Sequence, residues 1–280
     1  MSASKKRWKI LADALLTRSI SSESEEEVSV RRFRSFDLFP VQSKILDGDV
    51  TWHYFLLGST ILKIREVDKT VTKEDLAGFN NSGNVCIWPS EEILTYVCLN
   101  NEPLFERKTI IEVGGGMTCF AALAVAVKSF PKYVLCTDGN ERSVQNVANI
   151  IKANDFPAQK VATATFDWTD MERVEGLRNQ FDILLSADCL FFEESRKALV
   201  KAIWTILKDG GLAFIVAPAR GGSLDNFISM CQTYNFIIHR VDTYDSIIAN
   251  RHEKLCLENM SYNPDLHYPI LLKLSKPILK

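Results

Sequence analysis

Beyond residue 108, short apolar runs alternate with longer segments that carry both apolar and charged side chains. The short runs are rich in β-branched residues and predict strands, whereas the longer segments predict helices. This alternation favours right-handed βαβ units, so we expect an α/β fold with a doubly wound, mostly parallel seven-stranded sheet. We expect the last two strands to form an antiparallel hairpin without a long helix between them. The predicted strands are 109–113, 133–138, 160–166, 181–187, 211–217, 236–243 and 268–274, and the predicted helices are 117–129, 141–154, 193–207 and 223–234.

The first hundred residues show a different pattern. Three short runs with β character, 28–33, 51–55 and 60–64, are separated by polar or glycine-containing breaks and predict a small antiparallel lid. Pro89 and Ser90 predict the start of a helix over 91–100. We therefore expect three parts along the chain: a basic helix with an acidic flexible linker at 1–27, a β-rich lid with its lead-in helix at 28–100, and the α/β core at 101–280.

Composition and charge narrow the class of protein. Of the 280 residues, 46% are hydrophobic and 24% are charged, which suits one sizeable globular domain with an appendage. The net charge of −2 gives no global basic footprint for nucleic acid. The seven cysteines form no C-x-x-C pair, the dispersed histidines have no metal-ligand spacing, and no apolar stretch is long enough to span a membrane. We expect a reduced, soluble, intracellular protein that needs no metal, membrane or nucleic acid.

The stretch from Thr109 to Thr118 is the strongest chemical signal in the chain. A β-branched run ends in Glu112, and Gly114-Gly115-Gly116 then lead into a small-residue apolar helix. A strand, a tight turn and a helix N-terminus let the backbone approach a nucleotide-like ligand closely, although a purely structural turn stays open as an alternative. A dinucleotide fingerprint would need a glycine at position 119, where Cys119 stands, and this disfavours a nicotinamide oxidoreductase.

Acids follow three of the predicted strands, at the edge of the sheet where ligands bind. Asp138 can accept both hydroxyls of a ribose, or it can serve as a turn or N-cap residue. Asp167 and Trp168 can meet the amine and the face of an adenine, and an ordinary strand-end pair is an equal alternative. Asp188 lies where a donor and an acceptor would meet, or it caps the helix near Glu193.

Several motifs together carry a resemblance to a known family. The E-x-G-x-G of Glu112 to Gly116 resembles the first motif of the seven-strand, S-adenosylmethionine-dependent methyltransferases, with Thr118 in place of a common third glycine. Asp188-Cys189-Leu190-Phe191 resembles the D-x-x-Y/F motif of the protein-lysine branch, with phenylalanine in place of a hydroxyl-bearing tyrosine. Within that branch, the strings at 84–92, 113–119, 137–141 and 187–191 are similar to those of the calmodulin-lysine methyltransferase family.

The resemblance and the strand-end residues together give a set of candidate site residues. Glu112 is expected near the methionine amino group of the donor, Asp188 is expected to orient the acceptor amine, and Phe191 to line its channel. The candidate cofactor-binding residues are Trp88, Glu112, Gly114, Gly115, Gly116, Asp138, Asp167, Trp168 and Ala187, and the candidate catalytic residues are Asp188 and Phe191.

The resemblance implies an enzyme that transfers methyl groups from S-adenosylmethionine to a lysine ε-amine of calmodulin, up to the trimethylated state. The basic runs at 5–9 and 31–34 suit such an acidic partner, and the helix predicted over 5–16 either docks on its own domain or binds a partner. We expect a monomer in the cytoplasm and the nucleus. Two alternatives stay open: another protein lysine as acceptor, and a non-catalytic scaffold that binds calmodulin. A nucleic-acid methyltransferase is disfavoured because Asp188-Cys189-Leu190-Phe191 lacks the prolines of that class.

Overall fold

The computed structural model describes residues 33, 35–47, 50–67, 86–154, 156, 161–190 and 192–278. The predicted helix over 5–16, the linker, most of the predicted 28–33 run and Phe191 lie outside these residues. The fold therefore concerns the small sheet, the α/β core and the connections between them.

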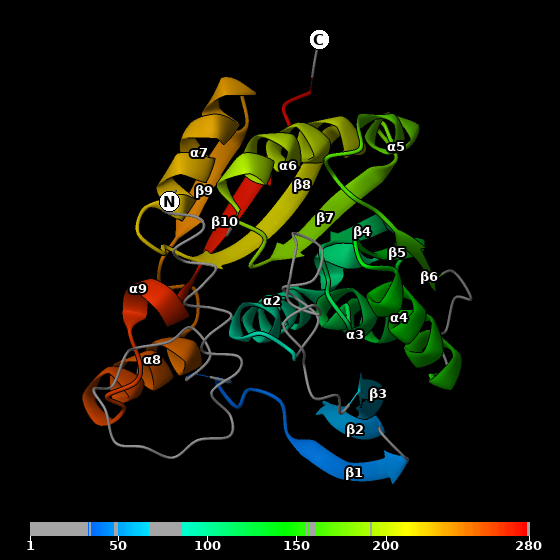
Figure 1. Ribbon diagram of the computed structural model, residues 1–280, viewed down its shortest axis with the longest axis vertical. Coiled ribbons are helices and arrows are strands. Elements are labelled where there is room, and N and C mark those ends of the chain that lie inside the picture. The colour runs from blue at the N-terminus through cyan, green and yellow to red at the C-terminus, as the bar shows by residue number, and fades with distance from the viewer. Residues whose placement is uncertain are drawn as a thin grey trace.

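The core is a seven-stranded, mostly parallel sheet, as predicted (Figure 1). Its order is β6-β5-β4-β7-β8-β10-β9, and β10 runs antiparallel to both β8 and β9. The topology confirms the doubly wound α/β fold that strand–helix alternation indicates. The strands are β4 (Thr109–Val113), β5 (Tyr133–Asp138), β6 (Val161–Thr165), β7 (Phe181–Ala187), β8 (Leu207–Pro218), β9 (Ile237–Val241) and β10 (Pro269–Ser275).

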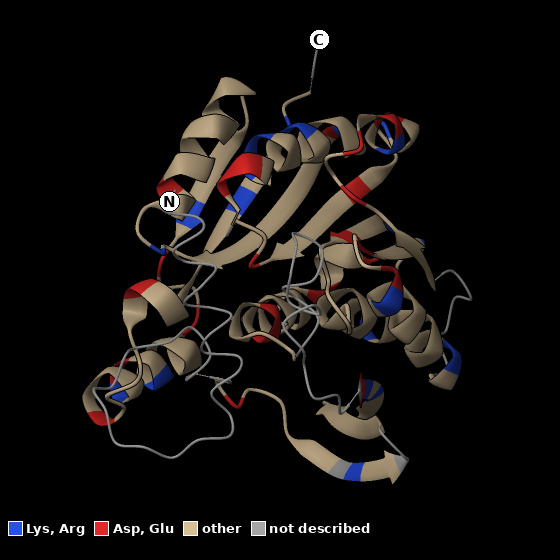
Figure 2. Ribbon diagram, in the orientation of Figure 1, with Lys and Arg blue, Asp and Glu red and all other residues tan. Residues whose placement is uncertain are grey.

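Helices cover both faces of this sheet, which explains why its central strands are almost continuously apolar. Neighbouring residues of one strand point to opposite faces, so Ile110 packs into one core cluster and Ile111 into the other. Charged residues of both signs lie mainly on helices and loops (Figure 2). On one side of the sheet lie α2 (Pro89–Leu99), α3 (Phe120–Lys128) and α4 (Glu141–Ala153), and on the other lie α5 (Met171–Gly176), α6 (Glu193–Ile206) and α7 (Ser223–Thr233) (Figure 1).

The predicted hairpin between the last two strands is wrong in its connection, although the two strands are antiparallel neighbours. Between them lie α8 (Ser246–Glu258) and α9 (Pro264–His267). Only Ile248 of α8 is buried, so this helix has almost no apolar stripe for a periodicity argument to find. Its start is set instead by Asp245, whose side chain accepts hydrogen bonds from the backbone N–H groups of Ile247 and Ile248.

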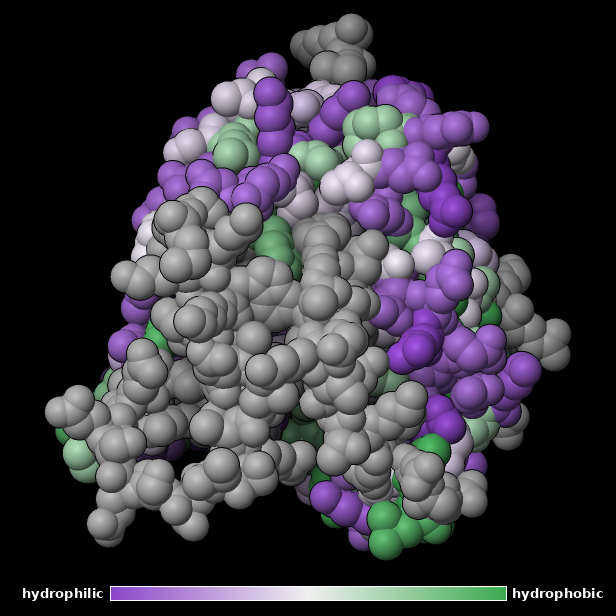
Figure 3. Space-filling view, in the orientation of Figure 1, coloured by the Kyte–Doolittle hydropathy of each residue, from purple (hydrophilic) through white to green (hydrophobic). Residues whose placement is uncertain are grey.

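A separate antiparallel sheet consists of β1 (Val41–Asp47), β2 (Val50–Leu57) and β3 (Thr60–Val67). Leu62 and Ile64 of this sheet pack into the core cluster that contains α3. Hydrogen bonds also join the sheet to α4, because the Asn154 side chain bonds both the N–H and the C=O of Lys63, and Arg65 bonds Asn146. The outer strand β1 exposes Ile45 and Leu46. Figure 3 shows an apolar region at the lower end of the molecule, where Figure 1 places β1. A short 3₁₀ turn, η4 (Glu102–Phe105), precedes β4. Whether the small sheet acts as a lid stays a prediction.

The helix α2 packs against α3 and against β7, β8 and β10 of the large sheet. Among the described residues, no helix combines the length and the apolar character needed to span a bilayer. Glu92 of α2 is buried and holds the segment before β1. Its carboxylate accepts hydrogen bonds from the Ser35 hydroxyl at 3.0 Å, the Phe36 N–H at 2.7 Å and the Leu38 N–H at 2.6 Å. Glu92 therefore joins the segment at 35–38 to α2, beside the packing of Phe36 in the core.

Replacing Glu92 with alanine should lower the free energy of unfolding by about 1–3 kcal/mol, because buried donors at 35–38 would lose their acceptor. Urea unfolding measures the change, and limited proteolysis should show faster cleavage near residue 36. Glu172→Ala, at an exposed position on α5, is the matched control. Equal stability of the two variants would show that the Glu92 contacts do not hold the segment.

Candidate functional site

The turn after β4 consists of three glycines. Side chains that pack against the turn leave no space for a Cβ atom. Gly114 and Gly116 have φ values of 71° and 60°, in the left-handed region. A Cβ atom at Gly114 would overlap the Cys189 sulfur and lie 3.2 Å from the Trp168 ring. The turn continues through Cys119, which is also left-handed with φ 42°, so α3 begins at Phe120 and not at 117 as predicted.

Two acids occupy the start of α3. The first N–H groups of a helix lack partners within the helix and carry partial positive charge. Ala121 N–H donates to Glu91 Oε1 at 2.8 Å, and Ala122 N–H donates to Glu112 Oε2 at 2.7 Å. Glu112 is fully buried, so the structure places its carboxyl group beneath the glycine turn as a helix cap. Its predicted contact with a ligand amino group stays a prediction.

Burial raises the pKa of both carboxyl groups at this helix start. For Glu112 the pKa lies well above its usual value, because burial disfavours the charged form and the adjacent Glu91 carboxyl adds repulsion. Burial also raises the pKa of Glu91, against the effect of its backbone hydrogen bonds. The second carboxyl oxygen of Glu112, Oε1, has no hydrogen-bond partner among the described residues. Burial and the neighbouring Glu91 carboxyl therefore favour the protonated form of Glu112.

Asp138 ends β5 directly beside the glycine turn. Its Oδ2 accepts from the Gly116 N–H at 2.9 Å and its Oδ1 from the Asn140 N–H at 2.8 Å. Burial raises the pKa of Asp138 to about 6, and the two N–H groups oppose part of that effect. Asp138 does form a turn, but Asn140 caps α4. Because each carboxylate oxygen can accept a further hydrogen bond, Asp138 retains acceptor capacity for ligand hydroxyls.

The two candidate residues that follow β6, Asp167 and Trp168, lie in different environments. Trp168 is buried, and its ring lies against Gly114 at the glycine turn. Asp167 Oδ1 accepts from both the N–H and the hydroxyl of Thr169, an arrangement typical of a turn aspartate. The structure thus brings Trp168 to the turn, while the contacts predicted for Asp167 and Trp168 with a ligand base stay predictions.

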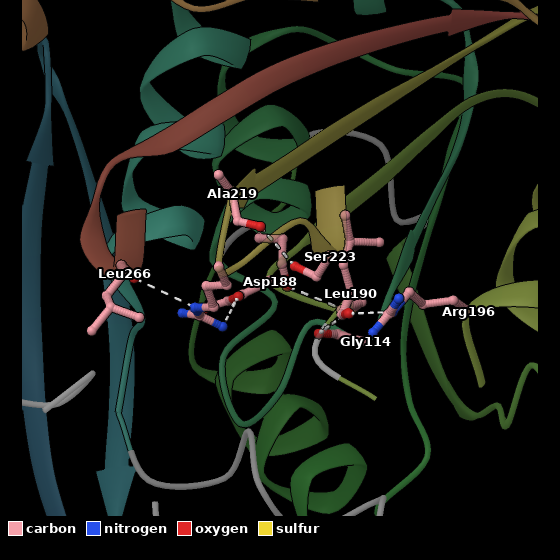
Figure 4. A network of polar contacts seen from close by, with 10 residues as sticks. Gly114, Asp188, Leu190, Arg196, Ala219, Ser223 and Leu266 are labelled. Atoms are coloured by element: carbon pink, nitrogen blue, oxygen red, sulfur yellow. Dashed lines mark hydrogen bonds and ion pairs between the residues drawn. The ribbon is translucent and has the colours of Figure 1, made fainter. Parts of the chain in front are cut away.

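Asp188 follows β7, and its side chain forms an ion pair with Arg220 (Figure 4). The Asp188 N–H donates to the Val216 C=O at 2.9 Å, which keeps the residue beside β8. Arg220 Nη1 lies 2.5 Å from Asp188 Oδ1, and Nη2 lies 2.7 Å from Oδ2. The alternative of a helix cap does not apply, because α6 begins at Glu193 after Phe192 and the Asp188 carboxylate is engaged elsewhere.

Arg220 is a site residue that the sequence analysis missed. It follows β8 in Ala219-Arg220-Gly221-Gly222, which has the composition of a loop. Its position was the available signal. Arg220 lies at the carboxyl edge of the sheet, where Asp138 and Asp188 also lie.

The remaining candidates lie around the same edge or outside the described residues. Ala187 is buried at the end of β7, opposite Val216. Cys189 Sγ lies 3.6 Å from the Val113 C=O and 3.7 Å from the Gly114 C=O, so the loop after β7 touches the glycine turn. Trp88 precedes α2, and its C=O accepts from the first N–H groups of that helix. Phe191 lies outside the described residues, and its predicted role stays a prediction.

The arrangement suits a nucleoside-like ligand at the carboxyl edge of the sheet. The glycine turn presents backbone without side chains, and Asp138 next to it offers a carboxylate with acceptor capacity. Asp188 stands across the turn, on the loop whose Cys189 contacts Gly114. No group of three His, Cys, Asp or Glu side chains is placed to hold a metal ion in the described ranges.

Comparisons with known proteins agree with this geometry. Residues 71–233, more than half of the chain, match the model of a family described as lysine methyltransferase. A protein of Arabidopsis thaliana named calmodulin-lysine N-methyltransferase is 31% identical over 300 aligned residues, covering 99% of this chain and 98% of the relative. The crystal structure of TYW2 from P. horikoshii, in complex with MeSAdo, has a TM-score of 0.51 and 12% identity, covering 82% of this chain and 72% of that one. The last likeness concerns the fold.

Glu112→Gln should reduce the pH dependence of stability above pH 5, with the other buried acids keeping the remainder. In the native state the raised pKa keeps Glu112 protonated where the unfolded chain has lost that proton, so the unfolding free energy falls as pH rises above about 4.5. The slope from one such group reaches about 1.4 kcal/mol per pH unit. Glutamine can still accept from Ala122 but carries no proton to lose.

Urea unfolding between pH 5 and pH 8 measures this slope for the wild type and the variant. Glu172→Gln, at an exposed position, should keep the wild-type slope. A Glu112→Gln protein with the wild-type slope would contradict a protonated Glu112.

Proposed function

Because the chain belongs to the family of S-adenosylmethionine-dependent lysine methyltransferases, we propose that it methylates the ε-amine of a lysine in calmodulin. The observation that carries the proposal is the 31% identity to a plant calmodulin-lysine N-methyltransferase, which spans nearly the whole of both chains. We also propose that the final product is trimethyllysine. The protein would act as a monomer in the cytoplasm and the nucleus, without a nucleic-acid or membrane partner.

The methyl donor is proposed to bind along the glycine turn. S-adenosylmethionine supplies an activated methyl group on a sulfonium. The backbone of Gly114, Gly115 and Gly116 would pass its ribose and methionine part, and Asp138 would accept from the ribose hydroxyls. One observation supports this: the Asp138 carboxylate, which accepts from the Gly116 N–H beside the turn, has capacity for further hydrogen bonds. The remaining residues proposed for the donor site are Trp88, Glu112, Asp167, Trp168 and Ala187.

The acceptor amine is proposed to meet Asp188. A lysine must lose a proton before its nitrogen can attack, and its usual pKa is about 10.4. Exclusion of water and a neighbouring positive charge both lower that pKa. Asp188 would accept a hydrogen bond from the neutral amine and direct its lone pair, a contribution of alignment and not of proton abstraction. Phe191 is proposed to line the channel.

The first test is transfer of a labelled methyl group from S-adenosylmethionine to unmodified calmodulin. We expect incorporation that disappears when one particular calmodulin lysine is replaced with arginine. Asp188→Ala should reduce the rate about a hundredfold or more while leaving donor affinity close to wild type, because alignment of the amine is lost. Asp225→Ala, at an exposed position on α7, is the matched control.

The other outcomes of this assay would contradict the proposed acceptor, the proposed activity or the proposed role of Asp188. Donor binding without transfer to calmodulin would favour another protein lysine as the acceptor. Binding of calmodulin without donor binding would favour a non-catalytic scaffold. An unchanged rate for Asp188→Ala would remove Asp188 from the mechanism.

Donor binding should depend on pH through Asp138. Its pKa of about 6 means that the carboxylate becomes protonated below pH 6 and accepts hydrogen bonds from hydroxyls less well. We expect donor affinity to fall by up to about tenfold for each pH unit below 6, as linkage requires for one group. Calorimetric titration between pH 5 and pH 8 measures this. Asp138→Asn should bind the donor more weakly and without that dependence, and a flat wild-type profile would exclude Asp138 as an acceptor.

A further inference from the structure

We propose that Arg220 is a positioning residue for methyl transfer: its ion pair fixes the Asp188 carboxylate and balances its charge, so that the site favours the neutral lysine amine. The inference rests on the proposed role of Asp188 toward the acceptor. It adds a residue that lies outside every motif of the resemblance.

The geometry of the pair fixes both oxygens of the carboxylate. The two terminal nitrogens of Arg220 lie 2.5 Å and 2.7 Å from the two oxygens of Asp188, the bidentate arrangement in which a guanidinium holds a carboxylate plane. The two side chains are each only 12% exposed, so water screens this pair weakly. One lone pair on each oxygen stays available, and the plane in which it points is set by Arg220.

The backbone at both residues of the pair adopts a conformation that is rare for residues with a side chain. Asp188 has φ 57° and Arg220 has φ 39°, and Gly221 and Gly222 continue the left-handed stretch at 59° and 87°. Glycine is the residue that adopts this region without strain, and yet an arginine occupies position 220. Strained residues persist where the surrounding structure holds them, and they cluster at functional sites.

The connection between β9 and β10 holds Arg220 from the other side. The Arg220 N–H donates to the Asp265 C=O at 2.8 Å, and the Gly221 N–H donates to the Asp265 carboxylate at 2.9 Å. Arg220 Nε lies 3.4 Å from the Leu266 C=O, a long contact, while the terminal nitrogens of the same guanidinium contact Asp188. The short helix α9 thus sets where the guanidinium lies, and with it the Asp188 carboxylate.

The charge of Arg220 matters because of the acids around it. Asp188 faces it from the end of β7 and Asp265 from α9, with His267 on the same short helix. Asp138 and Glu91 act on the loop after β7 through Cys189, whose thiol has a pKa raised by burial. An unbalanced carboxylate would favour the ammonium form of an arriving lysine, which has no lone pair for attack. The guanidinium offsets that attraction and leaves the acceptor oxygens in place.

Two variants separate the charge of Arg220 from its geometry. Arg220→Met removes the charge at similar length, so the pH at which kcat rises should shift upward by about one unit. Arg220→Lys keeps the charge and loses the fork, so kcat should fall about tenfold or more while its pH profile stays close to wild type. A residue with only a structural role would not move the profile, because kcat reports the ionisations of the bound complex.

The assay uses the full chain with saturating S-adenosylmethionine and unmodified calmodulin between pH 6.5 and pH 9.5. Calorimetric donor binding checks that each variant is folded. Arg240→Met is the matched control, because Arg240 on β9 pairs with Asp225 of α7 and with Asp242 after β9, at the far edge of the sheet from the glycine turn. We expect its profile to match wild type.

The outcomes separate this inference from the proposed function. An active wild type whose Arg220→Met variant keeps the same profile would overturn the inference alone. An active wild type whose Arg220→Met and Arg240→Met variants shift equally would also overturn it. A wild type that binds the donor but does not methylate calmodulin would contradict the proposed function, and the inference with it.

Discussion

The site depends on two buried carboxyl groups at the start of α3. The N–H groups of a helix start that lies under a tight turn are out of reach of water, so they need acceptors from the protein. Glu112 supplies one from the end of β4, just before the turn, and Glu91 supplies another from α2. The next residue, Glu92, holds the segment at 35–38. Two consecutive residues of α2 therefore join the glycine turn, the sheet and the segment that leads into the small sheet.

Local pattern was sufficient to predict the central strands. The bounds of β4, β5 and β7 agree with prediction because parallel strands covered on both faces need uninterrupted apolar runs. The glycine turn was predictable because three consecutive glycines follow the strand directly in the sequence. Asp138 was identifiable because strand order places it beside that turn. These features are encoded by residues close to one another in sequence.

Features that depend on distant partners were not predictable from the chain alone. The acids Glu91 and Glu92 resemble ordinary first-turn residues of a helix, and nothing local shows that they serve another helix and another segment. Arg220 is separated from Asp188 by all of α6 and β8, so their pairing follows only from the folded sheet. The helix α8 was missed because it buries a single apolar side chain and carries its signal in one capping aspartate.

The position of β10 between β8 and β9 has a consequence for the order of events on the ribosome. Within the described sheet, β9 pairs only with β10. Until residues 269–275 have emerged, β8 and β9 therefore each have an edge without a partner strand. Open edges with apolar neighbours are sites of intermolecular pairing during synthesis. We therefore expect this half of the sheet to be completed only when β10 inserts between β8 and β9. The loop that carries Arg220 would then be set only once α9 has formed, because α9 holds this loop and directly precedes that strand.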